Sequence, residues 1–231
     1  MRNSAPAPDH GLEFVAGALA LDFTNTVGGT HTEPTHDHIR GFDDLVRFLL
    51  LARNVSEADA RRLITRAQRQ PAEARKVVER AVALREAIWR VFSAVANDET
   101  PTAEDVALLR KEALRAASRA ELAVAGGHGQ WIWRVGEDLE YPVGALARSA
   151  VELLTTAEEL SRLRECASET CQWLFLDRSK SRTRRWCDMR DCGNRAKARR
   201  FYERTTRAKR RGSSRRRPRG SAPRRRSSGR C

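Results

Sequence analysis

The chain has 231 residues, of which 44 are lysine or arginine and 30 are aspartate or glutamate, so its formal net charge is +14. A charge this far from zero favours an anionic partner. The longest apolar stretch, around residues 42–52, is interrupted by charged side chains and is far shorter than the ~20 residues of a bilayer span. The N-terminus also lacks the apolar segment of a secretory signal, so we expect a cytoplasmic protein with reduced cysteines and no membrane association.

The basic charge is concentrated in the last third of the chain. Residues 1–160 carry 19 Lys and Arg against 24 Asp and Glu, whereas residues 161–231 carry 25 against 6. The composition therefore predicts a flexible N-terminus at residues 1–10, a mildly acidic domain at 11–163 and a basic module at 164–209. Residues 210–231 contain only Arg, Ser, Gly, Pro, Ala and a final Cys, which predicts a disordered cationic tail.

Helical patterns dominate the first domain. Residues 11–30 favour a strand followed by a helix. Ser56 has the position of an N-cap, and a long amphipathic helix begins near Pro71 because apolar residues then recur every three or four positions up to residue 95. A further helix begins at Thr102 and ends near residue 119. Two β-prone runs, 121–125 and 130–135, flank a glycine-rich turn and predict a hairpin, and a last helix at about 142–163 leads into the first cysteine.

A group of polar residues lies in and after the first predicted helix. A metal or ligand site is one interpretation, but we favour a polar loop with capping Asp and Asn side chains, since no regular spacing brings the histidines together. Glu86 is predicted to form an i,i+4 ion pair with Arg90, with a functional buried carboxylate as the alternative. The polar group comprises Asp22, Asn25, His31, His36, Asp37 and His38.

Four cysteines form the pattern C-x4-C-x15-C-x4-C, at Cys166, Cys171, Cys187 and Cys192. Two matched pairs across a short segment allow four thiolates to surround one tetrahedral Zn²⁺. Disulfides are disfavoured in a reducing compartment, and a redox pair would more naturally have the spacing C-x-x-C. Because four thiolates leave no open coordination position, we predict a single structural zinc.

Aromatic residues lie beside these cysteines, in the strand-like run QWLFLD and before the third ligand. A patch this small cannot fold on burial alone, so metal binding should supply much of its folding free energy. We expect Trp173 and Trp186 to fill space around the metal, with base stacking as the alternative.

A basic helix is predicted after Cys192. Gly193 is expected to provide a positive φ for the metal knuckle, and Phe201 is expected to anchor the helix on the zinc core. Arginine can bind phosphates or guanine edges, so this helix is predicted to contact nucleic acid. The candidate contact residues are Arg195, Lys197, Arg199, Arg200 and Arg204.

The segment WCDMRDCGNRAKARRFYER at residues 186–204 resembles the CGNR-type zinc finger, whose tetrapeptide stands here at Cys192–Arg195. GALALDFTNT at residues 17–26 and LREAIWRVF at 84–92 resemble the ABATE domain that usually accompanies this finger. The resemblance implies a bacterial, stress-related transcription regulator that carries zinc on the four matching cysteines and binds DNA through its basic residues. It also implies an upstream α/β domain that senses something or mediates assembly.

These observations lead to an α+β fold: a mostly helical N-terminal domain with a short β-hairpin, then a four-cysteine zinc finger of a short hairpin and a basic helix, then a disordered Arg/Ser-rich tail. The function that we expect is a zinc-dependent, nucleoid-associated DNA-binding transcription regulator. The alternative is an RNA-binding or ribosome-associated zinc module. We do not expect an enzyme, because no nucleophile–base set or phosphate-binding loop is visible. A small-molecule effector of the N-terminal domain and the oligomeric state stay open.

Overall fold

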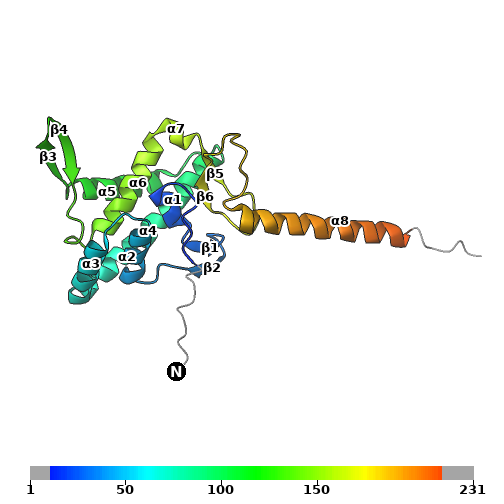
Figure 1. The fold of residues 1–231 in the computed structure, drawn as a ribbon, viewed down its shortest axis with the longest axis horizontal. Helices are drawn as coiled ribbons and strands as arrows, with labels where there is room; N and C mark the ends of the chain where they lie inside the picture. Colours follow the sequence, from blue (N-terminus) through cyan, green and yellow to red (C-terminus); the bar gives the residue numbers. More distant parts are fainter. Residues whose placement is uncertain (1–10, 215–231) are drawn as a thin grey trace, which may run out of the picture.

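The computed structural model describes residues 11–214. The predicted flexible N-terminus, residues 1–10, and residues 215–231 of the predicted tail lie outside this range. The fold is α+β, as predicted: a helical body, a small cysteine-rich module beside it and a long C-terminal helix that projects from that module (Figure 1).

The beginning of the described chain differs from the expected strand followed by a helix. Helix α1 spans Leu19–Thr24 and precedes an antiparallel hairpin of β1, Val27–Gly29, and β2, Pro34–Asp37. No strand is assigned between residues 11 and 18. The backbone oxygen of Ala16 accepts a hydrogen bond from the N–H of Leu176 at 2.8 Å, so this segment meets a distant part of the chain without forming a ladder.

The helices of the body begin where the sequence predicts. Ser56 and Thr102 are N-caps whose side chains accept hydrogen bonds from the backbone N–H groups three residues later, and Pro71 is the first residue of the longest helix. The helices are α2, Phe42–Leu51; α3, Glu57–Arg69; α4, Pro71–Ala96; and α5, Ala103–Ala117.

Helix α4 forms the centre of the body and contacts helices α1, α2, α3, α5 and α6. Its inward face is completely buried at Leu84, Ile88 and Phe92. These residues are spaced four apart, so one stripe of the helix faces the core along its length.

The predicted hairpin forms an arm that projects from the body (Figure 1). Strand β3 spans Glu121–Ala125 and strand β4 spans His128–Ile132. Only Gly126 and Gly127 form the turn, with φ values of 61° and 81°, as a two-residue hairpin turn requires. The second strand therefore begins two residues earlier than predicted.

The predicted helix at 142–163 is wrong in its second half. Helix α6 ends at Thr155 (Tyr141–Thr155), a short helix α7 spans Ala157–Leu160, and strand β5, Leu163–Glu165, pairs antiparallel with β6, Leu174–Leu176. Thr156 has an extended ψ of 90°, which interrupts the helix. Leu163 is buried opposite Leu176, so strand pairing with a distant segment overrides the local helical pattern.

The chain ends its described part in a π-helical turn, η1, Met189–Gly193, and helix α8, Asn194–Ser214. Helix α8 continues through residues 210–214, which were expected to belong to the tail. It extends away from the body (Figure 1). Within residues 11–214, no helix combines the length and apolarity needed to cross a membrane.

Candidate zinc centre and nucleic-acid interface

The four cysteines come from two short segments that the fold holds side by side. Cys166 directly follows β5 and Cys171 shortly precedes β6, so the pairing of these strands brings the first two together. Cys187 and Cys192 come from the segment that ends in η1. The N–H of Ala167 donates to the backbone oxygen of Arg185 at 2.8 Å and joins the two segments.

The geometry of the cluster fits one tetrahedral metal ion. All four sulfur atoms lie within 4.8 Å of one another, and all four residues are buried free cysteines. The Sγ of Cys187 lies 3.7 Å from that of Cys171 and 3.6 Å from that of Cys192. Zinc–sulfur bonds of about 2.3 Å place tetrahedral ligands ~3.8 Å apart, whereas a disulfide bond is ~2 Å long. The cluster therefore matches the predicted structural zinc.

Zinc binds thiolates, and the electrostatics favour that form at two of the four cysteines: the pKa values of Cys166 and Cys192 are lowered, whereas those of Cys171 and Cys187 are raised. Hydrogen bonds from the thiols of Cys171, Cys187 and Cys192 lower the pKa of Cys166. Arg195 donates to the Sγ of Cys192 at 3.0 Å and lies 3.2 Å from a carboxylate oxygen of Asp191. A guanidinium at this position stabilises negative charge on the sulfur.

Gly193 does not have the positive φ that was expected of it. Its N–H instead donates to the backbone oxygen of Asp188 at 3.0 Å, which closes the π-helical turn around Cys192. A Cβ atom at this position would lie 2.8 Å from the Sδ of Met189. Glycine is therefore required here because the Met189 side chain lies so close, and not because of the backbone conformation.

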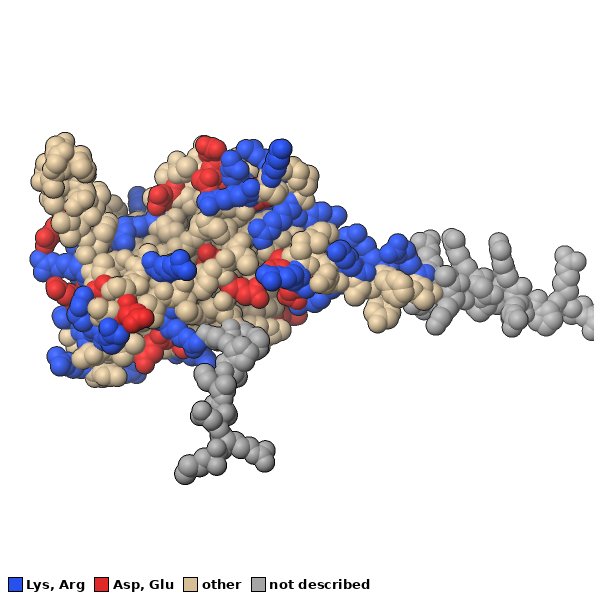
Figure 2. Space-filling model, viewed as in Figure 1, with Lys and Arg blue, Asp and Glu red and all other residues tan. Residues whose placement is uncertain are grey.

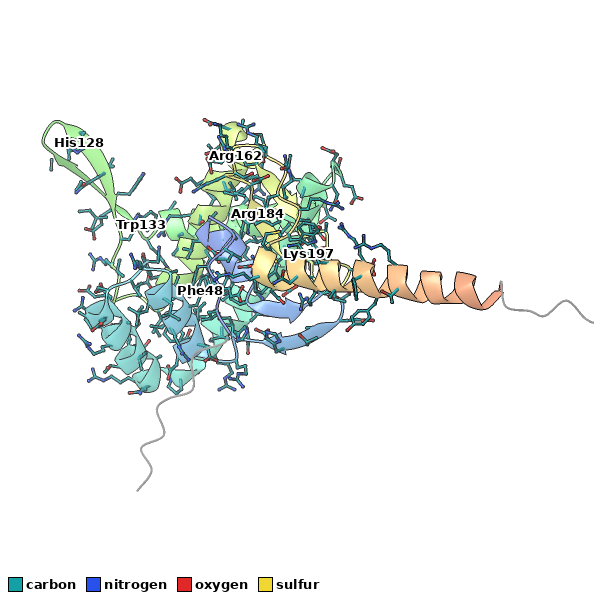
Figure 3. All side chains as sticks on the ribbon, turned by 45° about the vertical axis from the view of Figure 1, so that its right-hand side comes forward. Phe48, His128, Trp133, Arg162, Arg184 and Lys197 are labelled. Carbon is teal, nitrogen blue, oxygen red and sulfur yellow. The ribbon has the colours of Figure 1, made fainter. Side chains whose placement is uncertain are left out.

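The other predicted contact residues lie on the exposed surface of α8, beyond the zinc centre (Figures 2 and 3). Arg199 forms an ion pair with Glu169 at 2.5 Å, and the guanidinium of Arg200 lies 5.8 Å from the centre of the Trp186 ring. Arg204 donates to the backbone oxygen of Arg200. Lys197 forms no ion pair with any residue that the structure describes. These contacts leave cationic groups on more than one side of the helix.

Phe201 does not anchor the helix, contrary to the prediction. It is 61% exposed and Tyr202 is 69% exposed, with the two rings edge to face at 6.1 Å. Helix α8 projects away from the body (Figure 1), and both rings lie on its exposed surface.

Two family models match the chain. The ABATE model, described as "putative stress-induced transcription regulator", matches residues 17–157. The CGNR zinc finger model matches residues 162–205. The chain belongs to the ABATE family. Its C-terminal module is a CGNR zinc finger, as the sequence resemblance indicated, and no curated protein matches the chain.

The CGNR finger has a second basic element that the sequence prediction missed. The loop between β6 and Cys187 contains Arg178, Lys180, Arg182, Arg184 and Arg185. Arg184 is structural, because it donates to the backbone oxygens of Trp186 and Cys187, and Arg178 pairs with Glu159. The remaining three are exposed and form no ion pair within the described part of the chain. The density of cationic residues in this loop was visible in the sequence.

The aromatic residues of the finger are packed, as expected for Trp173 and Trp186. Both are partly buried against the core, and the indole N–H of Trp173 donates to the backbone oxygen of Val27 at 2.8 Å. Phe175 is completely buried, with the Arg184 guanidinium 4.3 Å from its ring centre. Stacking on a base is therefore left to the exposed rings on α8.

The finger is attached to the ABATE domain by buried hydrogen bonds. The side chain of Asn25 donates to the backbone oxygen of Leu174 at 2.9 Å and accepts from its N–H at 3.0 Å. The indole N–H of Trp89 donates to the backbone oxygen of Gln172, next to the ligand Cys171. The two parts also share one hydrophobic cluster. The zinc centre is therefore held on the ABATE domain and not on a separate linker.

The expectation of a polar loop with capping Asp and Asn side chains is wrong for Asp22 and Asn25: Asp22 lies within helix α1, and neither side chain caps that helix. Asp22 accepts a hydrogen bond from the N–H of Ala16 at 2.9 Å, and burial raises the pKa of Asp22 to about 6. Asn25 binds β6, as described above. The rings of His36 and His38 lie 4.6 Å apart, but within residues 11–214 the four cysteines are the only group that could hold a metal ion.

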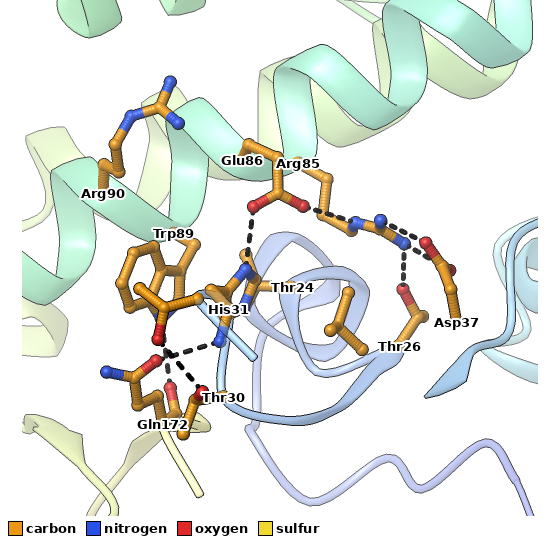
Figure 4. Close-up of polar contacts among 12 residues, drawn as sticks. Thr24, Thr26, Thr30, His31, Asp37, Arg85, Glu86, Trp89, Arg90 and Gln172 are labelled. Carbon is orange, nitrogen blue, oxygen red and sulfur yellow. Dashed lines mark hydrogen bonds and ion pairs between the residues drawn. The ribbon is translucent and has the colours of Figure 1, made fainter. Parts of the chain in front are cut away.

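His31 and Asp37 of the polar group join a half-buried ion-pair network (Figure 4). Arg85, 2% exposed, donates to Asp37 at 2.6 and 2.8 Å and to Glu86 at 3.2 Å. Burial alone would raise the pKa of Asp37, but the hydrogen bonds from Arg85 bring it below its ordinary value. His31 stacks on Trp89 and places its Nδ1 2.9 Å from Glu86.

The predicted ion pair between Glu86 and Arg90 is wrong. Arg90 instead binds Asp105 of α5 at 2.5 Å. Residues four apart on α4 do share a face, but Arg90 binds Asp105 on α5, and Glu86 binds His31, which lies between β1 and β2.

Proposed function

We propose that this protein is a zinc-dependent DNA-binding transcription regulator, in which the structural zinc fixes the base of helix α8 and α8 contacts DNA. The observation that carries the proposal is the long basic helix that leaves the zinc centre and projects free of the body (Figures 1 and 2).

The dimensions and charge of α8 support this proposal. A helix of 21 residues is about 30 Å long, and the major groove of B-DNA is wide enough to admit an α-helix. The segment from Asn194 to Ser214 contains nine Lys and Arg but a single Glu. Such a helix gains affinity by displacing counterions from the phosphates.

The residues divide into two roles under this proposal. We assign Lys197, Arg199, Arg200 and Arg204 to DNA contact, together with the exposed cations of the loop before Cys187. Arg195 is a positioning residue, because its guanidinium binds the Cys192 sulfur. The ion pair of Arg199 with Glu169 is exposed and opens at little cost when a phosphate competes for the guanidinium.

Salt dependence tests the proposed contacts. We expect binding of the zinc-loaded chain to duplex DNA to weaken steeply with salt, and Lys197→Ala and Arg200→Ala each to reduce the slope of log K against log salt by about 1. Arg66→Ala on α3 is the matched control, since Arg66 is exposed at a distance from the finger (Figure 1). Fluorescence anisotropy measures all of them, with each variant also truncated after Ser214 so that the tail cannot mask the effect. Equal slopes for Lys197→Ala and Arg66→Ala would refute the assignment.

Selection from random duplex DNA tests sequence reading. The zinc-loaded protein should enrich a motif that a chelator-treated control does not. Exposed Phe201 and Tyr202 favour one alternative, binding of unpaired RNA bases. If single-stranded RNA displaces duplex DNA at equal concentration and Tyr202→Ala abolishes that advantage, the RNA-binding function replaces the first proposal.

We assign regulation rather than catalysis to the ABATE domain, with an effector or an assembly contact as its input and the nucleoid as the site of action. The Asn25, Trp89 and Trp173 hydrogen bonds supply the physical link from that domain to the zinc centre.

A further inference from the structure

The β3–β4 arm has an apolar face that nothing in the described chain covers. Leu122 lies opposite Trp131 in the register, and Val124 follows on the same face because side chains alternate along a strand. These three side chains are 63%, 58% and 75% exposed, in the order Leu122, Trp131 and Val124. A two-stranded hairpin is marginally stable alone, and a contiguous apolar patch marks an interaction site. The arm therefore needs a partner surface.

The same chain contains an apolar groove of about 830 Å³, which we call the α4 groove. Its floor is a stripe of α4 at four-residue spacing, completed by the start of α2 and the end of α3. Charged residues of both signs, including Arg40, Asp43, Arg75 and Glu79, form its rim. The apolar lining residues are Ile39, Phe42, Ala67, Pro71, Ala74, Val78 and Val82.

We propose that two copies of this chain form a dimer in which the arm of each copy inserts its Leu122, Val124 and Trp131 face into the α4 groove of the other. The contact is reciprocal, as a two-fold axis requires: the arm of the first copy meets the groove of the second, and the second arm meets the first groove.

Surface area favours this exchange over a contact between two arms. The apolar face of one arm exposes on the order of 400 Å², so two arms packed on each other would bury ~800 Å² in total, which is the size of a crystal contact. In the exchanged dimer each arm also covers the smaller exposed surface of the groove, and the two contacts together bury roughly 1,100 Å². That total exceeds the ~1,000 Å² that a specific interface needs, whereas the contact between two arms does not.

The chemistry of the two surfaces also agrees. Trp131 supplies the large rigid side chain that typically dominates an interface, and the groove supplies an apolar floor with a polar rim, the anatomy of a protein-binding site. Charges of both signs on the rim can pair with the exposed Glu121 and Arg134 at the base of the arm.

Sedimentation velocity of the zinc-loaded, nuclease-treated full chain tests the proposal, at about 1–100 μM and in high salt that suppresses nucleic-acid bridging. We expect a dimer for the wild type. Trp131→Thr on the arm and Val78→Glu in the groove should each raise the dimer Kd at least ~30-fold. Leu114→Gln, at an equally exposed leucine on α5, should leave it unchanged. Wild-type zinc content and circular dichroism establish that each variant is folded.

A mixing experiment separates exchange from other arrangements. Trp131→Thr retains an intact groove and Val78→Glu retains an intact arm, so the mixture has one intact contact and should associate more weakly than the wild type but more tightly than either variant alone. A monomeric wild type at the highest concentration overturns the proposal. A Val78→Glu variant that remains dimeric also overturns it and would indicate contact between the two arms. A small apolar molecule bound to the monomer in native mass spectrometry would overturn it as well, because the groove would then have a different occupant.

Discussion

Replacement of Asn25 by alanine should weaken the attachment of the finger to the ABATE domain. Asn25 is 2% exposed, and its amide binds both backbone polar groups of the completely buried Leu174. The Asn25 amide makes the two hydrogen bonds that a neighbouring strand would make to Leu174, on the edge of β6 opposite β5. Alanine would leave one N–H and one C=O of Leu174 buried without partners.

The magnitude follows from these two groups. Each buried backbone group left unpaired costs about 1–3 kcal/mol, so we expect Asn25→Ala to reduce the free energy of unfolding by ~3 kcal/mol. For a chain of this size, that corresponds to a fall in Tm of roughly 6–12 °C. The loss exceeds that of a typical substitution because the site is closed to water on both sides.

Urea denaturation of the zinc-loaded protein measures this change. Asn97→Ala is the matched control: Asn97 donates to the backbone oxygen of Ser93 at 2.9 Å and to a carboxylate oxygen of Glu165 at 3.1 Å, but it is exposed, so water replaces both lost partners. We expect the control to lose less than ~1 kcal/mol. Equal losses in the two variants would show that the Asn25 bridge does not hold β6, and the reasoning would fail.

Three further predictions concern charge and metal. Because burial raises the folded-state pKa of Asp22 to about 6, ionisation of Asp22 opposes folding. Its contribution favours the folded state at low pH and is lost as the pH rises from ~4 to ~6, so Asp22→Asn should gain ~1–3 kcal/mol over the wild type at pH 7 and show a flatter pH profile in chemical denaturation. Arg195→Gln should weaken zinc binding ~10–100-fold in a chelator competition. The control, Arg200→Gln, should leave the zinc affinity unchanged while weakening DNA binding. Equal zinc affinities in the two variants would refute the proposed role of Arg195. Chelation of zinc should release one ion per chain and abolish motif-specific DNA binding, and the β5–β6 amides should then lose hydrogen-exchange protection before those of α4, whose core is independent of the metal.

Much of the site was predictable because its signals are local. The spacing of the four cysteines specified a tetrahedral thiolate centre, and the geometry confirms that they converge. The loop cations before Cys187 were as visible in the sequence as those of α8. They escaped prediction because aromatic residues border the same segment and favoured its interpretation as a core around the metal.

Two of the errors share one physical cause, competition from distant partners. Glu86 and Arg90 have the correct helical spacing for an ion pair, yet Arg85, His31 and Asp105 lie closer to them in the fold. The helical pattern up to Leu163 was likewise overridden by pairing with Leu176. Phe201 is an apolar side chain of the kind that often packs a helix onto a core, but α8 points away from the body and leaves it exposed (Figure 1).

The sequence by itself determined the elements whose cause is short-range: the helix caps at Ser56 and Thr102, the start of α4 at Pro71, the paired glycines of the arm and the ligand set of the zinc centre. These depend on backbone preference, hydrogen-bonding capacity and spacing within a few residues. Only the tertiary structure decided that Asn25 holds the finger on the ABATE domain, that Arg195 binds a ligand sulfur, and that the arm and the α4 groove are both left uncovered within the described chain. Those outcomes depend on which surfaces and side chains meet when the whole chain is packed together, and no local pattern encodes them.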